Sequence, residues 1–394
     1  MSLLERLLAS TPTSAEDGRT ALQRIGLPGP RTESWRYSSM RALEGLDPGA
    51  PPLDAGAHAV LAGLSGDLAR VDAHGLDIAT ALPAGLSVAP VGAAGPASQP
   101  DLAFRVLNGA GPVLGAAVEV HAPVAGVWRL GTQHASLGFT QFRHQLRLHP
   151  GAELTLVEHL YGVDPSSGLS NTLVEVEIAA GARLRWIRLQ ELGSKAHAVQ
   201  RTELRVAGDG QLQYVACELG ALWSRHELAI DLLGASAQAE IHGLVAMRAR
   251  QHHDTQLAIH HRSAAAITRT LWKAVADQRA RSVFNGLIAV SPGADQTEAH
   301  LKTANLLLSA HAEIDTKPEL VIEADEVVCS HGATVGQLDE RALFYLRSRG
   351  IPEVQARQIL TLAFGGEVLA AIADAALRAA VAERVDAHLP QASA

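Results

Sequence analysis

The stretch Val174-Glu-Val-Glu-Ile-Ala-Ala-Gly-Ala-Arg-Leu184 indicates how the central part of this chain folds. Val174, Val176 and Ile178 alternate with two glutamates, which is the two-residue period of a strand with one buried face. A Gly-Ala turn then leads into another apolar segment. The stretch therefore predicts a strand, a tight turn and the start of a second strand.

The same unit recurs along the sequence. Gly151-Ala-Glu-Leu154 precedes Gly181-Ala-Arg-Leu184 by 30 residues, and Asp209-Gly-Gln-Leu212 follows after a similar interval. Short β-like runs continue from about residue 113 to 328 without a long helix between them. Repeated turn-plus-strand units are typical of a solenoid of stacked strands, with a β-sandwich as the rival fold. Aromatic residues make up only 4% of the chain, and a small aliphatic core suits the narrow interior of a β-helix.

The N-terminal part has a different pattern. Residues 1 to about 45 are predicted to be helical, with a capping box at Ser14-Ala-Glu-Asp17 and a stop at Gly26-Leu-Pro28. Residues 46–100 are rich in Ala, Gly and Pro and predict a loose connection with one helix near 55–71. We expect this region to flank the β solenoid.

The C-terminal part is predicted to be helical from Leu338. Gly350 suits the left-handed position after a first helix, and Pro352 suits the first turn of a second one that runs to about Phe364. A third helix is predicted over 366–388. Such helices bury little area alone and need a partner surface. The predicted regions are an N-terminal helical region with its connection (1–112), a β-helix core (113–333) and a C-terminal helical domain that binds a partner (334–394).

Composition excludes several classes of protein. The formal net charge of −8 argues against nucleic-acid binding and against docking on anionic membranes. No apolar run approaches the roughly 20 residues of a membrane span, and the N-terminus lacks the layout of a signal peptide. Cys217 and Cys329 are the two cysteines, too few for a disulfide framework. We therefore expect a cytoplasmic protein.

Common enzyme motifs are absent from the sequence. It contains no G-x-x-x-x-G-K-[ST], G-x-S-x-G, H-E-x-x-H or C-x-x-C, so we expect neither an ATP site of its own nor catalytic activity. A β-helical carbohydrate-active enzyme is an alternative, because five aspartates lie in the β region. Several of them sit beside turns, where Asp is favoured for backbone reasons. They are Asp254, Asp277, Asp295, Asp315 and Asp325.

Histidines are numerous, 18 in all. His252-His253 and His260-His261 lie in the β region, where stacking of solenoid turns could bring imidazoles together on a metal. The alternative is a hydrogen-bonded ladder of imidazoles on the outer face. Further histidines of the same region are His226, His242, His300 and His311. Cys217 is predicted to pack in the interior as a small apolar residue.

One pair of metal-ligating side chains stands out at the end of the β region, within Glu323–Asp339. Cys329 and His331 are two positions apart, so both side chains leave the same face of a strand. A thiolate and an imidazole both bind iron, but two cysteines fall short of the four ligands of a stable iron–sulfur cluster. Any cluster held here needs ligands from a partner chain. From the residues alone, Cys329 is equally a core thiol or a functional one.

Residues around this pair resemble the SufB/SufD family of iron–sulfur cluster assembly proteins. The resemblance lies in Cys329–Gly336 with Leu338-Asp339, then Leu343–Leu346 and Ser348–Ile351. The family pattern is also matched by Val283–Ile288, Asp295–Thr297, Asn305–Ser309, Asp315–Leu320 and Arg31–Tyr37. The chain is more similar to the SufD branch than to the SufB branch, because it lacks extra N-terminal cysteines and has Gly332 where SufB has an acidic residue.

The resemblance implies a right-handed parallel β-helix between helical regions and a non-catalytic scaffold subunit in a SufB–SufC–SufD complex. It places Cys329 and His331 at the interface with SufB, as ligands of a transient iron–sulfur cluster, with His331 the stronger candidate. SufC, the ATPase of the complex, is expected to bind the C-terminal helices. Residues expected to contact it are Leu343, Tyr345, Leu346, Arg349 and Ile351. A purely architectural partner of SufB and SufC is the alternative role, and a homodimer is the alternative assembly of the isolated chain.

Overall fold

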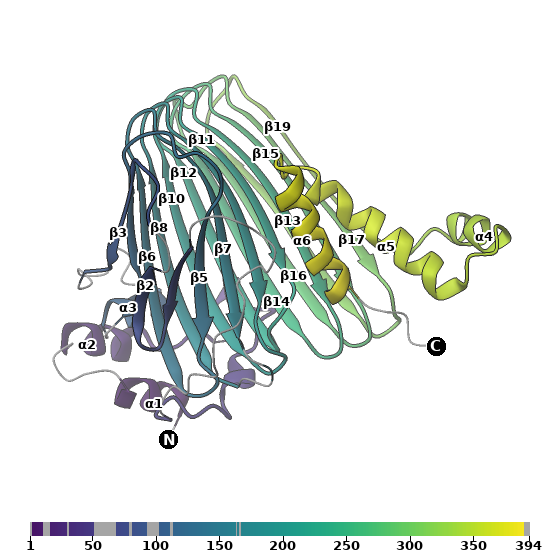
Figure 1. Cartoon of the computed structure of the whole chain (residues 1–394), viewed down its shortest axis with the longest axis horizontal. Helices are drawn as coiled ribbons and strands as arrows, with labels where there is room; N and C mark the ends of the chain where they lie inside the picture. Colours follow the sequence, from purple (N-terminus) through teal and green to yellow (C-terminus); the bar gives the residue numbers. More distant parts are fainter. Residues whose placement is uncertain are drawn as a thin grey trace.

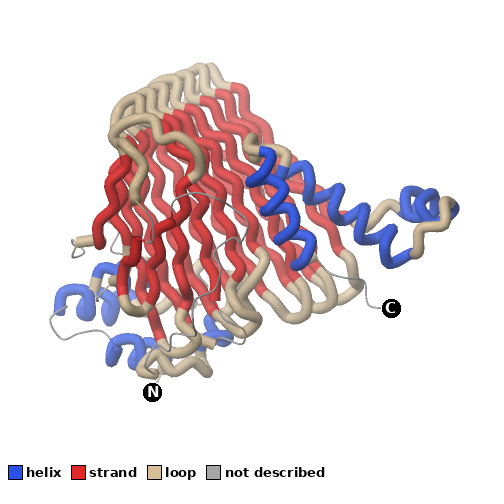
Figure 2. The backbone as a smooth tube through the Cα atoms, in the orientation of Figure 1, coloured by secondary structure: helices blue, strands red, loops and turns tan. Residues whose placement is uncertain are grey.

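The chain folds into an elongated β solenoid with helices at both ends (Figures 1 and 2). The structure is a computed structural model that describes residues 2–10, 16–29, 31–50, 68–78, 81–92, 102–110, 113–162, 164 and 167–389. The predicted parallel β-helix with helical flanks is confirmed, and the β-sandwich is wrong.

From β4 onward, successive strands alternate between two sheets, and each strand pairs in parallel with the strand two places further along the sequence. The first sheet has ten strands, β1 (Leu68–Asp72), β2 (Gly75–Ile78), β5 (Trp128–His134), β7 (Glu153–Gly162), β9 (Arg183–Glu191), β11 (Gln211–Glu218), β13 (Gln238–Met247), β15 (Ile267–Ala276), β17 (Glu298–Leu307) and β19 (Val328–Gly336). The second sheet has nine, β3 (Leu86–Pro90), β4 (Ala116–Val120), β6 (Phe139–Leu148), β8 (Leu169–Ile178), β10 (His197–Val206), β12 (Trp223–Leu232), β14 (His252–His261), β16 (Arg281–Val290) and β18 (Glu313–Ile322).

The turns predicted from the repeating unit lie where expected. Gly151, Gly181 and Asp209 have φ angles of 73°, 66° and 55° and precede β7, β9 and β11. The left-handed conformation is easy for glycine and tolerated by aspartate, which explains the Gly-Ala and Asp-Gly pairs. Later turns place Ser236 and Ala265 in the same conformation at some steric cost.

The interior core is mainly aliphatic, as predicted: most of its buried residues are Ala, Val, Leu and Ile, and a few large aromatic side chains lie among them. Trp128, Trp186 and Trp272 are among the largest fully buried side chains. Trp272 fits because its neighbour in register on β13 is Gly243, where a Cβ would lie 2.2 Å from the indole Cε3. The core therefore combines many small aliphatic side chains with a few large aromatic ones.

The N-terminal region packs on the outer face of the second sheet. Its elements are α1 (Leu3–Ser10), α2 (Glu16–Ile25), the 3-10 turns Glu33–Trp35 and Met40–Leu43, and α3 (Ala103–Gly109). Trp35 stacks between Phe104 and Trp223 at centroid distances of 5.7 and 6.3 Å, with the Arg225 guanidinium 4.0 Å from its ring. The stretch Arg31–Tyr37 thus ties this region to the solenoid. Of the helix predicted near 55–71, residues 55–67 lie outside the described residues, and 68–71 belong to β1.

Three helices end the chain, α4 (Glu340–Ser348), α5 (Glu353–Leu369) and α6 (Ala375–His388). Gly350 is left-handed at φ 85°, as predicted for the end of α4. The predicted boundary near Phe364 is wrong, because Gly365 lies inside α5, where its missing Cβ lets the helix approach Leu244 of the first sheet. The third helix consequently begins at Ala375 instead of 366. No helix of the described ranges has the length and apolar character that crossing a membrane would require.

The C-terminal helices differ in how they meet the solenoid. α6 covers part of the outer face of the first sheet and buries Cys217 beneath it, whereas α5 extends beyond the sheet and carries α4 away from the body (Figure 1). Lys273 of β15 anchors α5, because its ammonium group bonds the Phe364 carbonyl at 2.9 Å and pairs with Glu367. The predicted burial of Cys217 is confirmed, although it lies under a helix and not between the sheets.

Candidate functional site

Cys329 and His331 lie on β19, the last strand of the first sheet. In register beside them on β17 are Ala299 and Leu301, which belong to the apolar interior. Residues in register on parallel neighbours face the same way, so the side chains of Cys329 and His331 both face the interior of the solenoid. The pair lies at the mouth of that interior.

The mouth is open in the described part of the chain, where no strand pairs with the outer edge of β18 or β19. Leu301 is only 2% exposed, whereas His331, one strand further out, is exposed and Cys329 is half-buried against the interior core. We call β18 and β19 the terminal rung. It also exposes four large apolar residues, Val321, Ile322, Val328 and Val335.

Burial raises the pKa of the Cys329 thiol, and a hydrogen bond with the Ala299 backbone acts in the opposite direction. A raised pKa favours the protonated thiol at neutral pH. Metal binding requires the thiolate, so an approaching cation would have to displace the proton. The environment of Cys329 is therefore not that of a permanently reactive cysteine.

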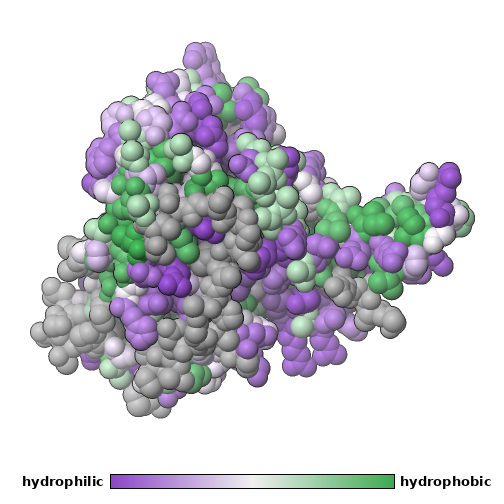
Figure 3. All heavy atoms as spheres, viewed as in Figure 1, coloured by the Kyte–Doolittle hydropathy of each residue, from purple (hydrophilic) through white to green (hydrophobic). Residues whose placement is uncertain are grey.

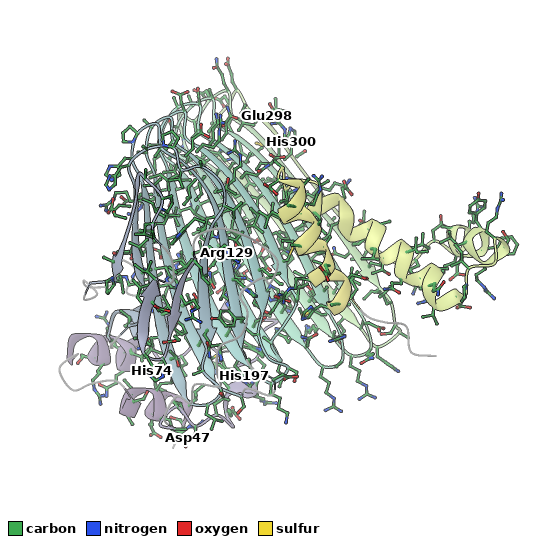
Figure 4. All side chains as sticks on the ribbon, in the orientation of Figure 1. Asp47, His74, Arg129, His197, Glu298 and His300 are labelled. Atoms are coloured by element: carbon green, nitrogen blue, oxygen red, sulfur yellow. The ribbon has the colours of Figure 1, made fainter. Side chains whose placement is uncertain are left out.

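A polar relay lies on the opposite, outer face of the same strand. The Ser330 Oγ is 2.7 Å from His300 Nδ1, and His300 Nε2 is 3.2 Å from Glu298 Oε1 (His300 and Glu298 are labelled in Figure 4). Arg269 in turn donates to Glu298 at 2.7 Å. These side chains link β19 to β17 and β15 directly behind the Cys329–His331 pair. Sequence reasoning missed this relay, although the alternation of Glu298 and His300 on one strand face was available.

The described residues hold no cluster of three or more His, Cys, Asp or Glu side chains suited to a metal ion. His226, His253 and His261 are buried inside the solenoid instead of forming a ladder on the outer face, so that prediction is wrong for them. His253 is within hydrogen-bonding distance of Ser224 and Thr255, at 2.7 and 3.0 Å. Burial lowers the pKa of His253 to about 4, which keeps its ring neutral.

The aspartates considered for an enzyme do not gather in one groove. Asp254 is buried in an ion pair with Arg225, and Asp315 lies on β18 in an ion pair with Arg281 at 2.8 Å. Each charge is already compensated by a neighbouring guanidinium. These two pairs support the structure and leave no free acid and base side by side.

The C-terminal helices carry the residues predicted to bind a partner. Leu343 is buried, Leu346 and Ile351 are half-buried, and Tyr345 is exposed with the Arg349 guanidinium 5.2 Å from its ring. We call α4 together with the part of α5 that extends beyond the sheet the projecting arm, and Figure 3 shows green, apolar areas along its α5 portion. Among the large apolar side chains of the described residues, Phe344 is the most exposed, at 73%, and it was not among the predicted contacts. The other exposed apolar residues of the arm are Val354 and Ile359.

Comparison with known proteins gives the relatives of the chain. Residues 131–364 match the model described as SUF system FeS cluster assembly, SufBD core domain. The chain is 34% identical over 260 residues to the iron–sulfur cluster assembly protein SufD of Escherichia coli, covering 66% of this chain and 62% of that protein. It is 36% identical over 211 residues to the SufBD family protein slr0076 of Synechocystis, and 33% over 224 residues to the chloroplastic protein ABCI7 of Arabidopsis thaliana. These two matches cover 53% and 56% of this chain and 46% of each relative, so the matches span about half to two thirds of the relatives' lengths.

Proposed function

This chain belongs to the SufBD family of the SUF system, and we propose from that premise that it is the SufD-type scaffold subunit of a SufB–SufC–SufD complex. In this role it takes part in cytoplasmic assembly of iron–sulfur clusters without catalysing a reaction of its own. The cluster is cargo, held transiently between this chain and a SufB-type partner. Residues 1–112, 113–333 and 334–394 are the regions we assign to support, β-helix core and ATPase binding.

The observation that carries the proposal is the position of Cys329 and His331 at an open edge. Two ligands cannot complete a cluster that usually takes four. A partner strand that adds to β19 would bring its own side chains next to them, because directly opposed residues on paired strands have Cβ atoms about 4.5–5.5 Å apart. The ligand set would then be shared across the interface, with His331 the first candidate and Cys329 the second.

The projecting arm has the features of a binding site for a second partner. Phe344, Tyr345 and Ile359 expose apolar surface that the described residues leave uncovered. Exposed apolar patches of this kind mark protein interaction sites. Because the sequence has no P-loop, we assign the energy-converting step to a SufC-type ATPase docked on this arm. Leu343, Leu346, Arg349 and Ile351 shape the same surface.

The test is reconstitution of the complex from this chain and the SufB and SufC homologues of its own cell. His331→Ala should lower cluster formation, measured by absorbance of the bound cluster, while all three subunits still copurify. His311→Ala is the matched control, because it removes another exposed histidine outside the terminal rung. Full cluster yield with His331→Ala would remove this residue from the site.

A purely architectural role is the second candidate, favoured by the exposed apolar arm. Under that role, Cys329→Ser and His331→Ala would both leave the cluster yield unchanged. Phe344→Asp would still abolish copurification of the ATPase, because a carboxylate would be buried in an apolar interface. The purely architectural role would therefore be supported if Cys329→Ser and His331→Ala left the cluster yield unchanged while Phe344→Asp abolished ATPase copurification.

A further inference from the structure

The strand that carries the candidate ligands has little side-chain packing to hold it. On β19 only Cys329 is half-buried, and the other residues of the strand are exposed. In the described part of the chain β19 pairs with β17 alone, so its backbone is hydrogen-bonded on one side. Segments with few buried contacts open locally more readily than the core does. The positions of the Cys329 thiol and the His331 imidazole therefore depend on the few side-chain hydrogen bonds between β19 and its neighbours.

The polar relay behind the pair provides one of these hydrogen bonds. Arg269 donates to the Glu298 carboxylate at 2.7 Å, and Glu298 Oε1 lies 3.2 Å from His300 Nε2 (Figure 4). A carboxylate only accepts hydrogen bonds, so the neutral His300 ring carries its proton on Nε2. His300 Nδ1 is then an acceptor, and the Ser330 hydroxyl donates to it across 2.7 Å. Every group of the relay therefore has the partner that its chemistry requires.

Other side-chain hydrogen bonds hold the far half of β19. The Asn305 amide donates to the Thr334 carbonyl at 3.0 Å, and the Thr334 hydroxyl donates to the Thr303 carbonyl at 3.4 Å. A strand rises about 3.3 Å per residue, so Thr334 lies about 10 Å beyond His331 along β19. The bond from Ser330 differs from these bonds because it starts between the two candidate ligands.

We propose that Ser330, His300 and Glu298 are positioning residues for the candidate cluster ligands. This inference rests on the proposed function, since it takes Cys329 and His331 to bind the cluster. The Ser330 side chain leaves the outer face of the strand, opposite the side chains of its two neighbours. Its hydrogen bond to β17 holds the backbone of both ligands in place without occupying the inner face. The thiol and the imidazole therefore stay accessible to iron while the strand that carries them is held.

The first measurement is the rate at which iodoacetamide alkylates Cys329 in the isolated chain. Cys217 is fully buried, so reaction of the native chain reports Cys329. Ser330→Ala should raise this rate about threefold, because a net hydrogen bond of ordinary strength is lost. His300→Leu should raise it by the same factor, and the double variant should add nothing further, because both changes break one network. His300→Gln keeps an acceptor for the Ser330 hydroxyl and should restore the wild-type rate.

Thr334→Val is the matched control for the alkylation experiment. It removes a hydroxyl hydrogen bond from the other half of the same strand, so the Cys329 rate should stay within about 1.5-fold of the wild type. Melting temperatures should not change, because Ser330 and Thr334 are both exposed. Equal rises with Ser330→Ala and Thr334→Val would show that β19 loosens as a whole and would overturn the role of the relay. An unchanged rate with Ser330→Ala would overturn it as well.

The second measurement is the cluster yield of the reconstituted complex. Ser330→Ala and His300→Leu should each lower the yield about threefold, and His300→Gln should keep it near the wild-type level, while all three subunits copurify. Faster alkylation of Cys329 combined with an unchanged yield would overturn the proposal, because the relay would then hold the strand without serving the cluster. A full yield with His331→Ala would instead overturn the proposed function, and the relay's role at the cluster with it. The alkylation result is independent of that failure, because it uses the isolated chain.

Discussion

The two ends of the solenoid are built from the same strand-and-turn unit but end differently. At the N-terminal end, the first sheet finishes with β2, a four-residue strand antiparallel to β1, and the second with β3, a five-residue strand antiparallel to β4 that ends at Pro90. At the C-terminal end, β18 and β19 are ten and nine residues long and continue the parallel ladder to an edge at which no strand of the described residues pairs.

This difference indicates that the N-terminal end of the solenoid has a structural role, whereas the C-terminal end is free to pair with a partner. Short, antiparallel or proline-ended strands blunt an edge, whereas a long strand with free donors is a template for pairing. The N-terminal region also covers the outer face of the second sheet over β8, β10 and β12, through Leu169, Val199 and Trp223. We call these three strands the covered region. The covered region should respond to substitution by losing stability, and the terminal rung by losing partners.

The largest expected effect is at the docked tryptophan of the covered region. Trp35→Ala should lower the free energy of unfolding by about 3–5 kcal/mol, because it empties a buried site between Phe104 and Trp223. Chemical denaturation followed by circular dichroism measures this loss. Phe344→Ala on the exposed arm is the control and should change stability by less than about 0.5 kcal/mol. A small loss for Trp35→Ala would mean that the N-terminal region unfolds separately from the solenoid.

Two glycines extend the comparison from the solenoid interior to the terminal rung. Gly243→Ala should cost about 1–3 kcal/mol, since the new Cβ would lie 2.2 Å from the Trp272 ring in a packed interior. Gly332→Ala on β19 meets no atom within 4 Å and should stay within about 0.5 kcal/mol of the wild type. Thermal melts of the two variants side by side provide the measurement. A costly Gly332→Ala would show that the terminal rung is already packed against something in the isolated chain.

Acid should destabilise the interior through its buried histidines. Burial lowers the pKa of His144 and of His253 to about 4, below the ordinary histidine value of 6.5. The unfolded chain therefore binds more protons than the folded chain between these values, so the stabilising contribution is complete above about pH 6.5 and is lost as the pH falls toward 4. Denaturation series from pH 7.5 to 4.5 should show this decline.

His144→Gln isolates one of these contributions. In the wild type, the His144 Nδ1 accepts a hydrogen bond from the Ala116 N–H at 3.3 Å, and the His144 Nε2 lies 3.1 Å from the Thr132 hydroxyl. A proton added at Nδ1 would therefore have no acceptor. The variant should be less stable at pH 7.5, but its stability should fall less steeply with acid than that of the wild type. An identical pH slope would show that His144 does not contribute to the acid sensitivity.

The smallest expected effect is at the candidate ligand itself. His331→Ala should change the free energy of unfolding of the isolated chain by less than about 0.5 kcal/mol, because the side chain is exposed. Differential scanning calorimetry of the variant beside His311→Ala is sufficient to measure it. A loss of several kcal/mol would make His331 a structural residue and remove the contrast between the two ends.

Much of the fold could be predicted from local pattern. The alternation in Val174–Ile178 and the turns at Gly151 and Gly181 predicted stacked strands, because side-chain direction and left-handed turns are local properties. The shared face of Cys329 and His331 followed from the same two-residue period. The helix boundary near Phe364 could not be predicted, because only the tertiary structure shows that Gly365 lies where α5 closely approaches Leu244.

The sequence by itself determined the repeating strand-and-turn unit and the two-residue spacing of the Cys329 thiol and the His331 imidazole. It also determined that the chain has too few cysteines to hold an iron–sulfur cluster alone. Only the tertiary structure decided that this pair faces the interior, that it lies on the last strand, and that His300 of the neighbouring strand bonds Ser330 behind it. The physical reason is that alternation fixes which residues share a face, whereas the register of distant strands fixes which face is inside and which edge remains unpaired.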